Sequence, residues 1–324
     1  MDSAEAVFVV KFPTRRFEAA FCNVAAGLSA QTMAPIRAFE GNLRAVVRIL
    51  TLPYQLSGAA IQQRRIDQLY RAELIRSLDL EDSSRDNSPE RHSAAMAKAL
   101  EAFRAEFETE QGLKTYIEQA IADLSGRLHL DEITTAAADL LRQATSMTWT
   151  SLEILFRDLV TVVLNANPSL VPLLLRDDRA RQILDLKRID TEVLVDHGFD
   201  LKGKMGNIIG SHDALARLDT MRVLFRAFCP EEAAVSQMLD ERELWLLAQQ
   251  RHLIVHRRGI VDAQYLDNTG DSRQKGSLLA FTPTEVVEQI LLVQRVGLGV
   301  ARALSGLLET TPGPLDNAEG KGEP

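Results

Sequence analysis

The sequence predicts an all-α protein, with a long-helix N-terminal region followed by a C-terminal helical bundle. Three observations predict this class. Long segments are rich in Ala, Leu, Glu and Arg, which are favourable helix residues. Hydrophobic residues recur at helical spacing, and alternating, strand-like runs are few. The composition, 46% hydrophobic and 25% charged, is that of a globular protein, and 324 residues suffice for two modest domains.

The N-terminal half opens with a short strand-like segment, residues 6–12, and is helical from there on. Residues 54–80 are predicted to form one amphipathic helix, which the polar run after it ends. Ser88 followed by Pro89 is typical of a helix N-cap and first helical residue. We expect the helix that starts there to continue to about Leu124.

The C-terminal half is predicted to begin with a long helix from Asp131 to about Leu164. The glycine-rich residues 202–211 lack both the residue order of a phosphate loop and the strand that precedes one, so we interpret them as a loop between helices. Residues 231–256 form the next predicted helix. A loop with hairpin potential, residues 268–281, follows it.

The last predicted helix has a clear start. Thr282 can cap it, Pro283 takes the first helical position, and Glu285 stands where a capping-box acid reaches back to the cap. This helix is expected to end near Leu308. Residues 309–324, rich in Gly, Pro and acids, are expected to be disordered.

These elements divide the chain into three expected parts. Residues 1–140 form an N-terminal helical region with a regulatory or sensor role, residues 141–308 form the helical domain, and residues 309–324 form the tail. The boundary is placed near residue 140, inside the long helix.

The charge balance narrows the possible partners. The chain has 37 Lys and Arg against 45 Asp and Glu, which gives a formal net charge of −8. Such a protein is poorly suited to coat long nucleic acids through a broad basic surface. A short basic cleft remains compatible with this charge.

Cysteine use and the N-terminal residues indicate the compartment. Cys22 and Cys229 lie far apart and outside any Cys/His cluster, so we expect buried free thiols and no structural metal. The chain starts with acidic residues where a signal peptide needs basic ones. Its most apolar stretch, residues 286–308, is interrupted by polar and charged side chains. A cytoplasmic protein without membrane attachment is therefore expected.

A cluster of basic side chains near the end of the 231–256 helix is the most informative feature. Three arginines and two of the six histidines fall together: Arg251, His252, His256, Arg257 and Arg258. Guanidinium groups fit phosphate oxygens in a bidentate way, and an imidazole titrates close to neutral pH. This combination indicates a site that can hold an anion and move a proton.

Arg251 has an unusual position within its helix. It lies on the apolar stripe formed by Leu244, Leu247, Ile254 and Val255. A charged residue on such a stripe must be paired, or must face a cleft or a subunit interface.

The spacing of the two histidines adds a geometric condition. His252 and His256 are one turn apart and share a face, whereas Arg251 and His256 lie about 140° apart around an ideal helix. Arg251 and His256 can reach one phosphate if the helix ends near His256, or if a second subunit supplies the partner residue.

Arg251, four intervening residues and His256, on a late helix of an all-α domain, resemble the Arg-x4–6-His signature of the HEPN superfamily. The polar His252 directly after the arginine is similar to the family pattern. The sequence after His256 also looks like that of bacterial HEPN proteins, and residues 149–156 are similar to the family's early helix. The resemblance covers about residues 145–307.

This resemblance implies a HEPN-like bundle that acts as a homodimer and a metal-independent endoribonuclease. Arg251 and His256 would be catalytic, with His252 and Glu153 supporting them. From the residues alone, Arg257 and Arg258 either bind RNA phosphates or form a solvated edge of the helix. The family also suggests a toxin or antiphage abortive-infection effector, in which residues 1–140 restrain the activity or contact a regulatory partner.

Several alternatives stay open from the residues alone. His252 and His256 could be two ligands of a metal, although the sequence offers no third ligand beside them. Arg251 could instead be held in a structural ion pair with Glu153 or Asp262. Trp245 is expected in the core, with stacking on a base as the alternative.

At the level of function, two other classes compete with a ribonuclease. One is a non-catalytic HEPN-like module that binds a nucleotide or a protein. The other is a purely helical scaffold. An RNA substrate, and no metal or other cofactor, is the expectation for the leading hypothesis.

Overall fold

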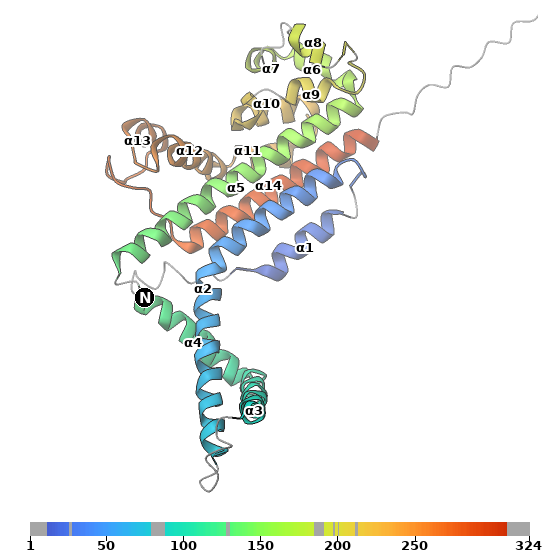
Figure 1. Cartoon of the computed structure of the whole chain (residues 1–324). Helices are drawn as coiled ribbons and strands as arrows, with labels where there is room; N and C mark the ends of the chain where they lie inside the picture. Colours follow the sequence, from blue (N-terminus) through green and yellow to red (C-terminus); the bar gives the residue numbers. More distant parts are fainter. Residues whose placement is uncertain are drawn as a thin grey trace, which may run out of the picture. The chain divides into compact units, whose positions relative to one another are not determined.

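The protein is all-α, as the sequence predicts. The computed structural model describes residues 12–25, 28–78, 88–127, 130–184, 191–196, 198–199, 201–210 and 213–309. Helices account for 83% of the structure, and the described residues form no β-strand (Figure 1). The strand-like segment predicted at residues 6–12 falls outside this part of the chain, apart from residue 12. The tail beyond residue 309 falls outside it too.

The described residues divide into two compact units. Unit 1 contains residues 47–141 and 281–284, and unit 2 contains residues 12–46, 142–280 and 285–309. Along the chain the division passes between Leu141 and Arg142, one residue from the expected boundary. Residues 12–46, expected with the N-terminal region, belong to unit 2.

Four helices contribute long apolar stretches to unit 2: α1 (Thr14–Ala25), the first part of α2 (Met33–Arg76), most of α5 (Asp131–Ala166) and most of α14 (Pro283–Glu309). Phe17, Phe21 and Phe39 join α1 to α2 through edge-to-face ring contacts. The Gln294 side-chain amide of α14 donates a hydrogen bond to the Phe17 carbonyl at 2.8 Å. These contacts make the helices one core (Figure 1).

Gly297 sets how closely three of these helices approach. A Cβ at this position of α14 would lie 2.5 Å from a Phe39 ring atom and 2.9 Å from a Leu155 methyl group. Only glycine therefore fits where α2, α5 and α14 meet. This contact holds α5, which carries part of the candidate site, against the core.

Shorter helices complete unit 2. They are η3 (Pro168–Leu170), α6 (Val171–Arg176), α7 (Asp178–Ile183), α8 (Thr191–Asp196), α9 (Met205–Gly210), η4 (Asp213–Ala216), α10 (Leu218–Phe228), α11 (Ala233–Asp240), α12 (Arg242–Arg257) and α13 (Ala263–Thr269). Four of them, η4, α10, α12 and α13, line the candidate site.

Unit 1 combines the second part of α2 with α3 (Pro89–Phe107), α4 (Glu110–Arg127) and the start of α5. The predicted start of α3 is confirmed, since the Ser88 side chain accepts a hydrogen bond from the Arg91 amide and Pro89 is the first helical residue. Between α2 and α4, the Ser57 hydroxyl donates to an Asp123 oxygen at 3.0 Å. Hydrogen bonds from Arg127, Arg64 and Ser57 lower the pKa of Asp123 to about 2.

Three predicted helix boundaries are wrong. The helix expected at residues 54–80 begins at Met33, because α2 continues through Pro53, which removes one backbone hydrogen bond without ending the helix. The helix expected to continue to about Leu124 breaks into α3 and α4. Helix α3 ends at Phe107, and the Thr109 hydroxyl accepts the Gly112 amide at 3.0 Å, as a side chain at a helix N-cap does.

The helix predicted at residues 231–256 is also divided. Glu241 adopts a non-helical conformation, φ −53° and ψ 136°, between α11 and α12. Its carboxylate pairs with Arg295 of α14 at 2.5 Å, which holds the break in place. Helix α12 therefore begins at Arg242.

The predicted hairpin at residues 268–281 and the predicted loop at 202–211 also differ from the structure. Helix α13 occupies residues 263–269, and an isolated antiparallel bridge joins Ile260 to Leu278. Short helix α9 forms within the glycine-rich segment.

The cysteines and α14 relate to two further expectations, that the thiols are buried and that the protein has no membrane attachment. Cys229 is buried, and burial raises the pKa of its thiol to about 12, whereas Cys22 is exposed, so the prediction of two buried thiols is wrong for Cys22. Helix α14 is long and apolar enough to cross a membrane by length and composition, as is α5 if the bent segment after it is counted. In α14, 56% of the most apolar window is buried inside the protein, and core helices pass the same test.

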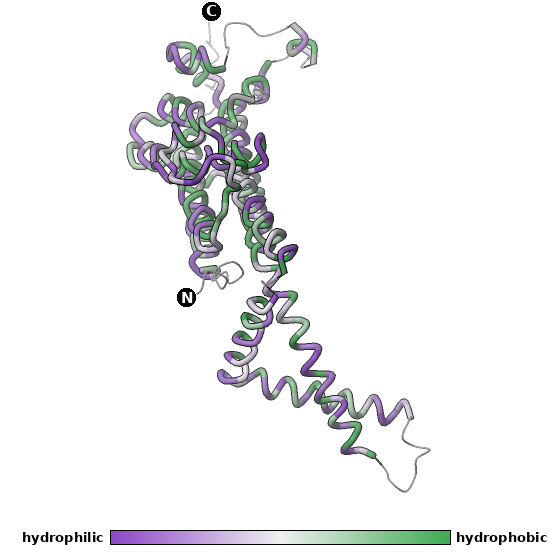
Figure 2. Tube along the Cα trace, turned by 90° about the vertical axis from the view of Figure 1, so that its left-hand side faces the viewer, coloured by the Kyte–Doolittle hydropathy of each residue, from purple (hydrophilic) through white to green (hydrophobic). Residues whose placement is uncertain are grey.

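Hydrophobic and hydrophilic residues are interspersed along the helices in both units (Figure 2). This is the pattern of amphipathic helices that each bury one face.

Candidate functional site

Helix α12 ends within the basic cluster, and residues 255–257 of its last turn are exposed. Arg258 caps it in the left-handed conformation, φ 57°, and Gly259 follows at φ 79°. The Gly259 amide donates to the Leu253 carbonyl at 3.1 Å, which closes the helix. A Cβ at Gly259 would lie 3.1 Å from the Arg142 side chain. The sequence therefore ends α12 at Arg257, directly after His256.

The predicted apolar stripe of α12 is confirmed except at its end. Leu244, Leu247 and Ile254 are buried, and Leu253 is buried beside them. Val255, predicted on the stripe, is 50% exposed because it lies in the exposed last turn.

Arg251 is both paired and at the edge of a cavity. One terminal nitrogen, Nη2, lies 3.2 Å from Oε2 of Glu153 on α5, and the exposed fractions of the two side chains are 27% and 10%. Arg251 Nε is buried without a hydrogen-bond partner among the described residues. The ion pair with Glu153 that the sequence left open is therefore present, and it uses only part of the guanidinium.

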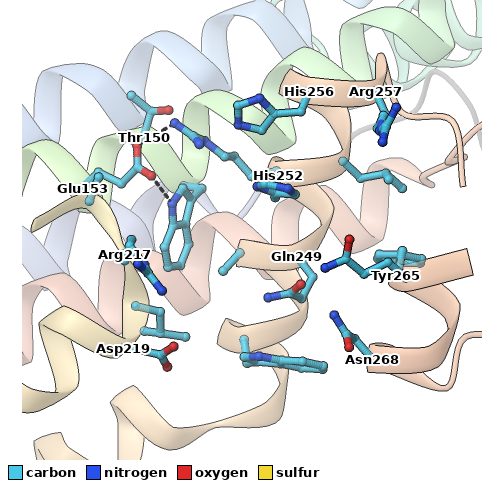
Figure 3. Close-up of a pocket in the computed structure, with 18 of the residues that line it drawn as sticks. Thr150, Glu153, Arg217, Asp219, Gln249, His252, His256, Arg257, Tyr265 and Asn268 are labelled. Carbon is cyan, nitrogen blue, oxygen red and sulfur yellow. Dashed lines mark hydrogen bonds and ion pairs between the residues drawn. The ribbon is translucent and has the colours of Figure 1, made fainter. Parts of the chain in front are cut away.

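Glu153 is held from two sides. Its second oxygen accepts a hydrogen bond from the indole N–H of Trp149, one turn earlier on α5 (Figure 3). Burial raises the pKa of Glu153 above its ordinary value, although Arg251, the Trp149 hydrogen bond and Arg157 all act in the opposite direction. A buried carboxyl thus fixes the position of the guanidinium.

The two histidines of α12 lie against each other, as their spacing predicts. Their ring centroids are 4.5 Å apart, and both project from the same face of the helix (Figure 3). Burial lowers the pKa of His252 below 6.5, and the nearby His256 and Arg251 lower it further. At pH 7, His252 is therefore protonated less often than an ordinary imidazole, and its neutral form can accept a proton or a hydrogen bond.

All of these groups line one cavity of about 1070 Å³ in unit 2. Four parts of the chain form its walls: α5, residues 216–219 at the start of α10, α12, and α13 with its N-cap. Arg251, His252 and His256 share this cavity, so residues 140° apart on an ideal helix do open onto one space. The volume is at the upper end of small-ligand pockets.

The cavity is cationic in an acidic protein. Four arginines line it, against three carboxylates: Arg157, Arg217, Arg251, Arg257, Glu153, Asp219 and Asp262. The net charge of the lining is positive even with both imidazoles neutral. Such a surface attracts anions.

The two remaining arginines of the predicted site have different places. Arg257 lines the cavity and lies 3.7 Å from Asp262, the N-cap residue of α13. Arg258 is exposed at the C-cap of α12 and lies outside the residues that line the cavity. Trp245 is only partly buried and lines the cavity, so its predicted place in the core is wrong.

Sequence reasoning missed several lining residues. Gln249 lies at helical spacing from both Trp245 and His252, and Arg157 lies one turn after Glu153, so both could have been found from these spacings. No spacing links Arg217 to the basic cluster. The described residues contain no group of three or more His, Cys, Asp or Glu side chains placed to hold a metal ion.

Comparison with known proteins gives no relative. A scan of protein-family models, a search of curated proteins and a search of solved structures each found no match.

Proposed function

We propose that this protein is a metal-independent endoribonuclease of the kind that the HEPN resemblance implies. One observation carries the proposal: Arg251, His252 and His256 line a single cationic cavity of about 1070 Å³. A site that cuts RNA without a metal needs a cation for the phosphate and an imidazole for the proton, and these residues supply both.

The proposed reaction uses the nucleophile that RNA itself carries. The ribose 2′-oxygen attacks the adjacent phosphorus as its proton leaves, and the bond from phosphorus to the 5′-oxygen of the next nucleotide breaks. The products are a 2′,3′-cyclic phosphate and a 5′-hydroxyl, which takes up a proton. His256 acts as general base or general acid, and Arg251 stabilises the charge on the phosphoryl oxygens.

Three residues support these two. His252, whose pKa is lowered by burial, orients the substrate or assists the proton transfer. Glu153 positions Arg251 through the ion pair between them. Arg257 adds positive charge at the end of α12, where it can contact a neighbouring phosphate.

The proposal includes the biological setting that the resemblance implies. The chain acts as a homodimer through unit 2 in the cytoplasm, without membrane attachment, as a toxin or antiphage effector. Residues 1–140 contact a regulatory partner. Wild-type expression that arrests growth, beside harmless expression of His256→Ala, would support this setting.

Cleavage in the absence of free metal tests the reaction. Single-stranded RNA is incubated with the purified protein in excess EDTA, and product formation is followed on a denaturing gel. We expect cleavage by wild type, with a loss of about 100-fold or more in Arg251→Ala and in His256→Ala. Arg302→Ala, an exposed arginine of α14, is the matched control and should cut as wild type does.

Two results would count against the proposal. Cleavage that requires a divalent metal would exclude this mechanism, and undiminished cleavage by both variants would exclude these residues. Binding of RNA or nucleotide without turnover would instead select the non-catalytic module.

A further inference from the structure

One face of α12 presents an aromatic ring and polar side chains to the cavity. Trp245, Gln249, His252 and His256 follow one another at spacings of four, three and four residues, so they share a face, and all four line the cavity. At 1.5 Å per residue, Trp245 lies about 16 Å along the helix axis from His256. The cavity therefore extends well beyond the basic cluster.

Helix α13 adds two amides to the lining of the cavity. Gln264 and Asn268 are four residues apart, line the cavity and are exposed. Figure 3 shows Gln249 and Asn268 directed toward the same space, away from Glu153. Together with Trp245, these three amides define what we call the Trp245 subsite.

The polar side-chain atoms of this subsite have no hydrogen-bond partner in the described part of the chain. The side chains of Trp245, Gln249, Gln264 and Asn268 make no hydrogen bond with any residue in the described ranges. Trp149, by contrast, is buried and donates its indole N–H to Glu153. A partly exposed indole beside three free amides is suited to a flat ligand with donors and acceptors on its edge.

Charge identifies the class of flat ligand. Arg217 lines the cavity, is exposed, and makes no ion pair within the described residues. Arg251, His252 and His256 line the same cavity from α12, beyond Trp245 and Gln249 along that helix. A ligand that fits here combines a planar ring with a phosphate, which favours a nucleotide over a neutral sugar.

We propose that the Trp245 subsite binds one unpaired nucleobase of single-stranded RNA, with the base stacked on the Trp245 indole and its edge hydrogen-bonded by Gln249, Gln264 and Asn268. This inference rests on the proposed function, because it places the substrate of the same cavity. A base buried within a duplex cannot reach the indole face, so the substrate is single-stranded.

A pair of equally charged oligonucleotides tests the subsite. One is a fluorescent 2′-O-methyl RNA hexamer, which carries no free 2′-OH and cannot be cut. The other is a hexamer of the same length that lacks every base. We expect fluorescence anisotropy to show that wild type binds the first at least about fivefold more tightly, in line with the stacking energy of one base.

Variants test whether the difference in affinity between the two hexamers arises at the Trp245 subsite. Trp245→Ala should bind the two hexamers equally, and Gln249→Ala/Asn268→Ala should reduce the preference while keeping the ring. Trp245→Phe, which keeps an aromatic face, guards against loss of folding and should retain part of the preference. Gln274→Ala removes an exposed amide outside the cavity and should leave the preference unchanged.

The outcomes separate this inference from the ribonuclease proposal. Equal binding of both hexamers by wild type, or a preference that survives in Trp245→Ala, would overturn the subsite even if RNA is cleaved in EDTA. A Trp245-dependent preference in a protein that cuts no RNA would support the subsite and overturn the ribonuclease proposal.

Discussion

At the scale of single residues, the site depends on the guanidinium of Arg251, whose hydrogen-bond donors are only partly satisfied within the described residues. Glu153 engages one terminal nitrogen of the guanidinium, and Arg251 Nε stays buried and without a partner in the described part of the chain. A buried donor without a partner costs about 1–3 kcal/mol, which a bound phosphate oxygen would recover. Glu153 thus orients the guanidinium without occupying it fully.

The pKa of His252 gives a test at this scale. Burial lowers it, and the adjacent His256 lowers it further, because two positive charges on rings 4.5 Å apart repel each other. In His256→Ala this repulsion is removed, so the pKa of His252 should rise toward 6.5. An NMR titration of the imidazole signals measures this directly, and a pKa that stays the same or falls would show that the histidines do not interact.

The direction in which pH changes the stability of the protein follows from the same lowered pKa of His252. Between pH 6.5 and the lower pKa of the folded state, the unfolded chain binds a proton at His252 that the folded protein does not. The contribution of His252 to stability is therefore present above pH 6.5 and is lost as the pH falls through that range.

At the scale of elements, the end of α12 determines where the basic side chains open onto the cavity. The chain turns at Arg258 and Gly259, both in the left-handed conformation, and Arg142 packs against the glycine. The Gly259 carbonyl then accepts the Leu279 amide at 2.8 Å. A helix that continued past this point would carry His256 and Arg257 in its interior turns.

Replacing this glycine tests the claim. Gly259→Ala combines a strained backbone with a contact to Arg142 at 3.1 Å, and we expect a loss of about 2–3 kcal/mol in the free energy of unfolding. Gly270, at φ 66° with no atom within 4 Å of where an alanine Cβ would lie, is the matched control and should lose only about 1–2 kcal/mol as alanine. Chemical denaturation measures both. Equal losses would mean that the contact with Arg142 is unimportant.

The elements also show what the sequence can predict. Ser88 with Pro89 and the proline at residue 283 mark helix starts in the structure, because capping chemistry is local. The break at Glu241 is not predictable in this way, since it depends on an ion pair with Arg295, 54 residues later. The continuation of α2 through Pro53 likewise contradicts the local rule.

The candidate site likewise has features that the sequence can predict and features that it cannot. The basic cluster and the contact between the two histidines follow from spacing on one helix. The pairing of Arg251 with Glu153 was one of the alternatives that the sequence left open. The contributions of Arg217 and Asn268 need the tertiary fold, because they come from the segment before α10 and from α13.

At the scale of the whole molecule, the acidic chain has one cavity whose lining carries a net positive charge. The chain carries a formal net charge of −8, yet the lining of one cavity is positive. An acidic surface repels most of a polyanion, while the cavity attracts a short part of it. The protein is thus suited to handle a few phosphates at one time.

Salt dependence measures this contrast. Each phosphate neutralised on a single strand contributes about −0.7 to the slope of log affinity against log salt concentration. Two to four phosphates in the cavity predict a slope of about −1.5 to −3 for a longer single-stranded RNA bound to His256→Ala. Anisotropy titrations at several salt concentrations give the slope, and a much steeper value would indicate binding along an extended basic surface instead.

The central claim is that the 2′-oxygen of RNA is the nucleophile at the Arg251 and His256 site. Its most direct test is mass spectrometry of the products formed in EDTA from an RNA oligonucleotide and from the same oligonucleotide with a 2′-deoxyribose at the cleaved position. We expect a 2′,3′-cyclic phosphate and a 5′-hydroxyl from the first and no cut at that position in the second. A cut at the deoxy position, or a 5′-phosphate product, would contradict it.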